Sequence, residues 1–446
     1  MRKITTLALL MAGSCAFALT KPKVYLNPGH GGWSPNDRPL ATISHPMLPE
    51  TGRPDTCGFY ESNTNLFKIL ELGRILKNTG QYYLKYSRKA NGPFPWVKGA
   101  ANETKYDRPL AEIAAEVDSY RPDYFISVHS NAAGDGVLAN YPLFLYRGTD
   151  AENAVAGSKD MCTKMWPFHV EAMKAKFEFQ SAYATSTNIR GDRDFYHYTW
   201  TNPKGYQGYL GVLMHGCPGY LVEGYFHTYQ PSRHRALNPD WCGMEGRRYA
   251  RGIIDYFGTT ADTLGCIMGE VRCKAKRMDG YDFYTYSTAT NDGYLPLNGA
   301  TVRLKNEEGY VVAQYQVDDN YNGIFVFTDL KPGIYYVDLY CVGYRTQQSR
   351  IASNKYTVKA NQTSYKTHFM AVGVAVPLTP ADEINDAVEA VPASDTLIED
   401  RMTVRLYDAS GKLVTTTTRQ QLDYLGLPAG IYVMESCGRT MKYQRK

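Results

Sequence analysis

The chain lacks the features of a nucleic-acid-binding or membrane-embedded protein. Its formal net charge is only +5 over 446 residues, and its basic residues are spread out rather than gathered in one stripe. Past the N-terminal segment, no apolar run reaches the roughly 20 residues that a bilayer demands. Its nine cysteines form no close CxxC pair, which argues against a cysteine-held metal site. With 43% hydrophobic residues, the chain can bury at least two cores, so we expect a multidomain globular protein.

The N-terminus has the pattern of a secretory signal. Arg2 and Lys3 precede an apolar stretch, and Ala16-Phe17-Ala18 is the small-x-small pattern of a cleavage site. We therefore expect residues 1–18 to be a signal peptide and the mature chain to begin at Leu19. Cys15 leaves lipid attachment as an alternative, although the residues before it fit that signal poorly. Export places the other eight cysteines where disulfides persist, so we expect disulfides or buried thiols.

Residues 23 to 257 alternate between strand and helix patterns. A helical run opens at Glu61 and can stop at Gly80. A second helix follows Pro109, the strand YFISV comes next, and a last helix is expected near Arg247 to Phe257. This alternation predicts an α/β fold with a mostly parallel twisted sheet flanked by helices.

Two stretches interrupt this alternation. Residues 33–57 are rich in Pro, Gly and Thr, and residues 134–219 are rich in Tyr, Gly and Asn. Long loops in a compact domain are usually functional or contain extra structure, so we interpret both as walls over a crevice. Their aromatic side chains either contact substrate or pack the insertion; the candidates are Tyr183, Tyr196, Tyr198 and Tyr206.

Three strand-like runs each end on a metal ligand or proton carrier. They are VYLNPGH, YFISVH and GYLVE, which end on His30, His129 and Glu223. The carboxyl ends of parallel strands gather at one crevice, and Glu61 at the start of its helix would join them there. Two imidazoles and a carboxylate suit Zn²⁺ with one open coordination position, and the second carboxylate can move protons. The pattern therefore predicts a zinc hydrolase.

Each of these residues also has a purely structural alternative. A lone histidine is more often part of a core than a ligand. Glu61 could be a helix N-terminal acid favoured by the dipole, and Glu223 could be a buried acid paired with Arg190 or Arg193. Arg88 and Arg108 are expected to brace the fold, although either could reach an anionic substrate. The remaining histidines lie in loops or insertions, and none is singled out: His45, His169, His197, His215, His227 and His234.

Four sequence motifs resemble those of a known enzyme family. LNPGHGG, FYESNTNL, FISVHSNAA and YLVEGYF occur in this order within residues 22–258, and together they resemble the zinc-dependent N-acetylmuramoyl-L-alanine amidases, which are cell-wall hydrolases. The resemblance implies a catalytic domain over residues 19–260, with zinc on His30, Glu61 and His129 and Glu223 as the catalytic base. It also implies cleavage between muramic acid and L-alanine. Asn27 departs from the family, which usually has Asp there, so ligand orientation is expected to differ.

The remaining residues predict two β-rich units. Residues 266–372 resemble a carboxypeptidase-regulatory-like β-sandwich, through Gly269-x-Val271 and Leu330-x-Pro332-Gly333-x-Tyr335, and such modules are spacers or binding accessories. Residues 373–396 are rich in Ala, Pro, Asp and Glu, as a linker would be. Residues 397–446 resemble the β-rich C-terminal sorting domain that the type IX secretion machinery recognises. A third small sandwich without a sorting role is the alternative.

Together these patterns predict an exported zinc amidase that acts on the glycan strand and stem peptide of peptidoglycan. Its location is periplasm, cell surface or extracellular, with type IX machinery as a partner, no nucleic acid, and no stable transmembrane segment after signal cleavage. One alternative is a zinc peptidase that cuts the stem peptide. A different class is a non-catalytic peptidoglycan-binding surface protein.

Overall fold

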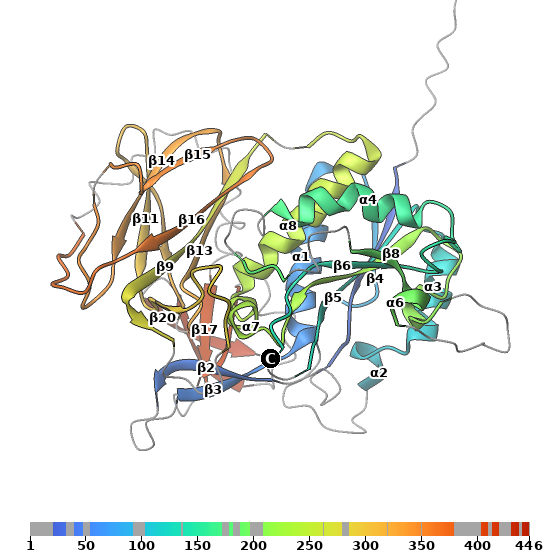
Figure 1. Ribbon diagram of the computed structural model, residues 1–446, viewed down its shortest axis with the longest axis horizontal. Helices are drawn as coiled ribbons and strands as arrows, with labels where there is room; N and C mark the ends of the chain where they lie inside the picture. The colour runs from blue at the N-terminus through green and yellow to red at the C-terminus, as the bar shows by residue number, and fades with distance from the viewer. Residues whose placement is uncertain are drawn as a thin grey trace, which may run out of the picture.

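A computed structural model (Figure 1) describes residues 21–32, 40–47, 54–91, 103–134, 137–171, 178–181, 188–196, 208–261, 263–278, 285–318, 320–348, 350–378, 403–408, 413–418, 430–436 and 439–445. The predicted signal peptide, most of the predicted linker, and Tyr183, Tyr198 and Tyr206 lie outside these residues. Within them, no helix has both the length and the apolar character needed to cross a bilayer.

A six-stranded sheet forms the centre of the N-terminal half. Its strand order is β4 (Tyr83–Tyr86), β1 (Lys23–Pro28), β5 (Tyr124–Asn131), β8 (Gly219–Phe226), β6 (Leu143–Tyr146) and β7 (Ile189–Gly191). The first four strands are parallel to one another, while β6 runs antiparallel to β8. The prediction of a mostly parallel sheet is therefore confirmed.

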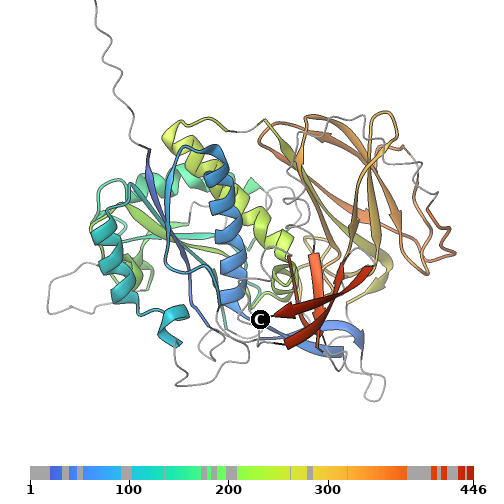
Figure 2. The ribbon, with the colours of Figure 1, turned by 180° about the vertical axis from the view of Figure 1, so that it is seen from behind.

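Helices cover both faces of this sheet (Figures 1 and 2). One face packs against α1 (Glu61–Thr79), α4 (Ser158–His169) and α8 (Pro239–Phe257), through a core that includes Leu72, Met165 and Ile253. The other face packs against α3 (Leu110–Tyr120) and the 3-10 helix η3 (Gly211–Leu213). The described residues of this half contain three shorter helices: α2 (Glu103–Tyr106), α6 (Asp192–Phe195) and α7 (Gln230–Ala236).

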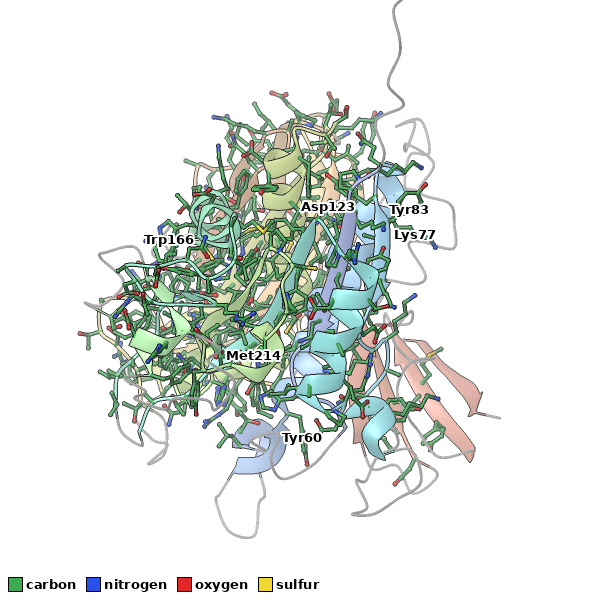
Figure 3. All side chains as sticks on the ribbon, turned by 90° about the vertical axis from the view of Figure 1, so that its right-hand side faces the viewer. Tyr60, Lys77, Tyr83, Asp123, Trp166 and Met214 are labelled. Carbon is green, nitrogen blue, oxygen red and sulfur yellow. The ribbon has the colours of Figure 1, made fainter. Side chains whose placement is uncertain are left out.

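The N-terminus of α1 lies at the carboxyl ends of the parallel strands. Figure 3 shows Tyr60, which precedes α1, at the opposite end of the domain from Tyr83 and Asp123, which lie where β4 and β5 begin. Gly80 ends α1 in the left-handed conformation, as the sequence predicts. A side chain in the first turn of α1 therefore lies at the edge of the sheet where β1, β5 and β8 end.

Two sequence predictions are corrected by the structure. The last helix was expected near Arg247, but α8 begins at Pro239, because the Asn238 side chain accepts hydrogen bonds from the backbone N–H groups of Asp240 and Trp241. The insertion at 134–219 is also more than a wall over a crevice. It contains β6 and β7, and these strands extend the central sheet beyond β8.

A β-sandwich follows the α/β half. Its first sheet contains β10 (Tyr294–Pro296), β9 (Gly265–Arg277), β13 (Ile324–Leu330) and β16 (Thr363–Phe369), and its second has the order β12 (Val311–Gln316), β11 (Thr301–Asn306), β14 (Gly333–Tyr340) and β15 (Lys355–Val358). Alternate residues of the two sheets, such as Val271, Val302 and Leu339, form a shared buried core. This agrees with the small sandwich predicted for this part of the chain.

The sandwich shares a second core with the α/β half. Phe67, Trp241 and Met244 from the helices cluster with Met268 and Ile324 of the sandwich. Since these side chains are all buried, the two parts pack directly against each other.

A buried ionic network crosses the same interface. Arg235 of α7 pairs with Asp292 of the sandwich, and Tyr229 donates a 2.6 Å hydrogen bond to the other oxygen of that carboxylate. Arg272 lies 3.6 Å from Asp292 and 2.7 Å from Glu270. Burial alone would raise the pKa of Asp292, but Arg235 and Arg272 hold it below its ordinary value.

The described residues also form two smaller sheets. The antiparallel C-terminal sheet has the order β18 (Leu413–Thr418), β17 (Thr403–Tyr407), β19 (Gly430–Ser436) and β20 (Arg439–Arg445), and β2 (Leu40–Met47) pairs with β3 (Pro54–Phe59). Six cysteines are free thiols, and all of them but Cys217 are buried: Cys162, Cys217, Cys242, Cys266, Cys273 and Cys341. The thiol alternative from the sequence therefore holds for these residues.

Candidate metal centre

His30 sits in a strained turn at the end of β1. Its φ of 56° lies in the left-handed region, which a non-glycine residue adopts only where its surroundings enforce it. Arg88 provides that enforcement, because its guanidinium donates to the carbonyls of Gly29, His30 and Ser62 at 2.8–3.0 Å. Arg88 therefore braces the turn against the start of α1, as the sequence predicts.

Glu61 is the first residue of α1 and is 1% exposed. Its Oε1 accepts a 2.9 Å hydrogen bond from the backbone N–H of Ser130, and the Asn65 amide lies 3.4 Å from the same oxygen. The positive end of the helix dipole also favours a carboxylate at this position. These contacts turn the carboxylate toward the carboxyl edge of the sheet.

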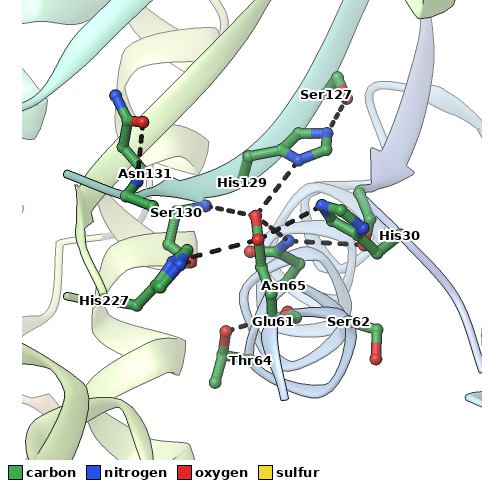
Figure 4. A network of polar contacts seen from close by, with 12 residues as sticks. His30, Glu61, Ser62, Thr64, Asn65, Ser127, His129, Ser130, Asn131 and His227 are labelled. Carbon is green, nitrogen blue, oxygen red and sulfur yellow. Dashed lines mark hydrogen bonds and ion pairs between the residues drawn. The ribbon is translucent and has the colours of Figure 1, made fainter. Parts of the chain in front are cut away.

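His30, Glu61 and His129 converge at that edge (Figure 4). His30 Nε2 lies 3.3 Å from Glu61 Oε2, and His129 Nδ1 lies 3.3 Å from Glu61 Oε1. One ligand atom from each of the three residues lies within 4.8 Å of the other two. The structure thus brings together the three residues that the sequence singled out as a metal site.

The protonation states in this cluster suit a cation. Burial alone would raise the pKa of Glu61, but the neighbouring imidazoles of His30, His129 and His227 hold it well below its ordinary value. Burial lowers the pKa of His129, against the opposing effect of Glu61. An ionised carboxylate and a neutral imidazole are the forms that bind a metal ion. Two nitrogens and one oxygen are also a donor set that zinc accepts.

The His129 ring is fixed from behind by a chain of polar side chains. Its Nε2 lies 3.1 Å from Ser127 Oγ, which accepts a 2.7 Å hydrogen bond from the Asn27 amide. The Ser87 hydroxyl donates to Asn27 Oδ1 at 2.6 Å, which orients that amide. Asn27 stands where the amidases that the sequence motifs resemble usually have Asp. It is a neutral group that contacts His129 through Ser127.

Gly29 leaves room for the same ring. A Cβ at this position would lie 2.1 Å from His129 Cε1, far inside van der Waals contact. Hence only glycine allows the turn after β1 to approach His129 so closely.

Glu223 lies on β8 directly opposite His129 in the parallel register. The two backbones are therefore one strand spacing apart, about 4.8 Å. Glu223 is 7% exposed, so its side chain is largely buried on the strand next to His129. Arg190, an alternative partner considered from the sequence, forms its 2.6 Å ion pair with Asp150.

His227 is a further residue at this site that the sequence predictions did not single out. Its Nδ1 lies 4.0 Å from Glu61 Oε2, and its side chain is 1% exposed. It follows the end of β8, so the strand-end pattern that marked His30 and His129 could have found it. The other described histidines of the α/β half have structural surroundings; His169, for example, stacks on Tyr249 at 5.2 Å.

Structural neighbours of this chain are N-acetylmuramoyl-L-alanine amidases. The amidase from Clostridium difficile 630 is 18% identical with a TM-score of 0.37, covering 54% of this chain and 100% of its own. The catalytic domain of CwlV from Bacillus (Paenibacillus) polymyxa var. colistinus is 16% identical, with a TM-score of 0.35 and coverages of 54% and 99%. The apo form of Ami1 from Mycobacterium abscessus is 17% identical, with a TM-score of 0.36 and coverages of 53% and 98%. No family model and no curated protein sequence matches the chain.

Proposed function

We propose that the protein is a zinc-dependent hydrolase that cleaves the amide bond between N-acetylmuramic acid and L-alanine in peptidoglycan. The supporting observation is the meeting of His30, Glu61 and His129, with their ligand atoms within 4.8 Å of one another. Three such ligands leave a fourth position open, as catalytic zinc requires. The choice of substrate comes from the four sequence motifs and their order.

In this proposal zinc, when bound, supplies a Lewis acid that acidifies water and polarises a carbonyl. Glu223 moves the proton. Its carboxylate takes one from the attacking water as the C–O bond forms, and returns it to the alanine nitrogen as the C–N bond breaks. The departing amine needs that proton because an amide nitrogen is a poor leaving group. The position of Glu223 opposite His129 suits this role.

Product analysis on purified peptidoglycan tests the proposal. We expect release of stem peptides with a free L-alanine amino terminus, loss of activity on chelation, and recovery with zinc. A new amino terminus on another residue would favour the zinc peptidase instead. Tight binding without peptide release, indifferent to chelators, would favour the non-catalytic binding protein.

The role of Glu223 has its own test. Glu223→Gln should lower kcat about 10²- to 10⁴-fold, the usual contribution of a general base. Zinc content should stay at the wild-type level, because Glu223 lies outside the group of three ligand atoms. A kcat within a few-fold of wild type would show that another group moves the proton.

We further propose that the chain is exported and that its C-terminal unit is a type IX sorting domain. In support, residues 403–445 contribute a separate antiparallel sheet, β18-β17-β19-β20. Fractionation with an antibody to residues 19–260 distinguishes periplasm from cell surface and medium. Deletion of residues 397–446 should retain the protein in the periplasm, and unchanged release would exclude the sorting role.

A further inference from the structure

His227 lies against the Glu61 carboxylate on the side away from His30 (Figure 4). Its Nδ1 is 3.0 Å from the Ser130 hydroxyl and 4.0 Å from Glu61 Oε2. His227 therefore acts on the Glu61 carboxylate electrostatically, while its hydrogen-bond partner is the Ser130 hydroxyl.

The His227 ring is held in place from several sides. Phe59 stacks on it with ring centroids 5.3 Å apart and planes inclined by 27°. Its backbone N–H donates to the Asn131 carbonyl at 2.8 Å, and Arg233 donates to its carbonyl at 3.2 Å. The ring stacking and the backbone hydrogen bonds therefore restrict the movement of the His227 side chain.

Ser130 connects this fixed ring to Glu61. Its backbone N–H donates to Glu61 Oε1 at 2.9 Å, while its hydroxyl contacts His227 Nδ1. Ser130 thus contacts both Glu61 and His227. The Glu61 carboxylate lies between them, with the Ser130 N–H on Oε1 and His227 near Oε2. In this orientation Glu61 Oε1 faces His129 and Glu61 Oε2 faces His30.

We propose that His227 is a positioning residue for Glu61, acting together with Ser130 to fix the carboxylate in its metal-binding orientation. The inference rests on the proposed function, since it takes Glu61 as a zinc ligand. Within the described part of the chain, the group of mutually close ligand atoms contains His30, Glu61 and His129 but not His227. His227 therefore acts on the ligand rather than as one. Groups that orient a metal ligand in this way typically contribute 10- to 100-fold to metal affinity.

Zinc affinity, measured by competition with a chromophoric chelator, tests this role without an activity assay. His227→Phe keeps an aromatic ring against Phe59 but removes Nδ1, so we expect roughly 10- to 100-fold weaker zinc binding. His227→Asn places an amide near the position of Nδ1 and should recover affinity to within about threefold of wild type. His234→Phe is the matched control, because His234 is equally buried at 1% and lies on the same segment away from the site. It should leave zinc affinity unchanged.

A second variant covers the case in which His227→Phe fails to fold. Ser130→Ala keeps the backbone N–H bond to Glu61 but releases the His227 ring, so affinity should fall about tenfold. In the double variant the losses should not add, because both changes break the same link. Wild-type affinity in His227→Phe or Ser130→Ala, or additive losses, would overturn the inference. A wild-type protein that binds no zinc would instead overturn the proposed function.

Discussion

The buried carboxylate of Asp292 should be a large contributor to stability, and Asp292→Asn tests this. Asp292 is fully buried, and the side chains of its partners Arg235 and Arg272 are only 1% and 2% exposed. Replacing the carboxylate with an amide leaves both guanidinium groups buried, with Glu270 and, near Arg235, Glu178 as the remaining acidic neighbours. Breaking a buried pair by removing one partner typically costs about 3–5 kcal/mol, because a charge stays desolvated without compensation. We therefore expect a loss of about 3 kcal/mol or more.

Urea unfolding, followed by circular dichroism and tryptophan fluorescence, measures this loss. The matched control is Asp329→Asn, which removes another carboxylate between the sandwich and α8, 3.0 Å from Arg247. Asp329 has a positive φ that asparagine tolerates. Its side chain is 28% exposed, so this pair should contribute only about 0–1 kcal/mol. Equal losses in the two variants, or less than about 1 kcal/mol for Asp292→Asn, would refute the reasoning.

Three further predictions concern the metal site and the response to pH. Gly29→Ala should push the His129 ring aside and weaken zinc binding at least about tenfold. Gly134→Ala is the control and should leave zinc binding unchanged, because its added Cβ would meet only Val137 at 3.7 Å. Competition with a chromophoric chelator measures the zinc affinity of both variants. Zinc at about 100 times its dissociation constant should stabilise the wild type by about 2.7 kcal/mol in thermal melts, and an unchanged melting temperature would contradict a built site. Burial lowers the pKa of His169 and His215 to about 4 and that of His234 and His368 to about 3. Each is neutral when folded and takes up a proton when unfolded below about pH 6.5. Stability should therefore be complete above pH 6.5 and fall on acidification by up to about 1.4 kcal/mol per pH unit for each histidine; equal urea midpoints at pH 7.5 and pH 5 would contradict this.

The sequence predicts the metal cluster because its geometry depends on local patterns. His30 and His129 follow strands and Glu61 starts a helix, and the parallel topology then brings such positions to one edge. The direction of β6 could not be predicted, since a short apolar run does not reveal its pairing partner.

The contacts that the sequence missed join residues far apart in the chain. His227 contacts Ser130, 97 positions away, and Asp292 pairs with Arg235, 57 positions away. The strand-end pattern could have marked His227 itself, but no local pattern records which distant residue a side chain contacts, and Asp292 alone resembles an ordinary polar residue. The start of α8 differs: Asn238-Pro239 is a local capping signal, so that helix could have been predicted in full.

The shared apolar core between the helices and the sandwich has a consequence for proteolysis. The connection between α8 and β9 is short, and its Thr259, Thr260 and Ala261 are not buried, so a protease could cleave there. A nicked molecule would still have Trp241 and Met244 packed on Met268 and Ile324. Separation would expose that apolar surface to water, so the two fragments should copurify under native conditions and part only in denaturant.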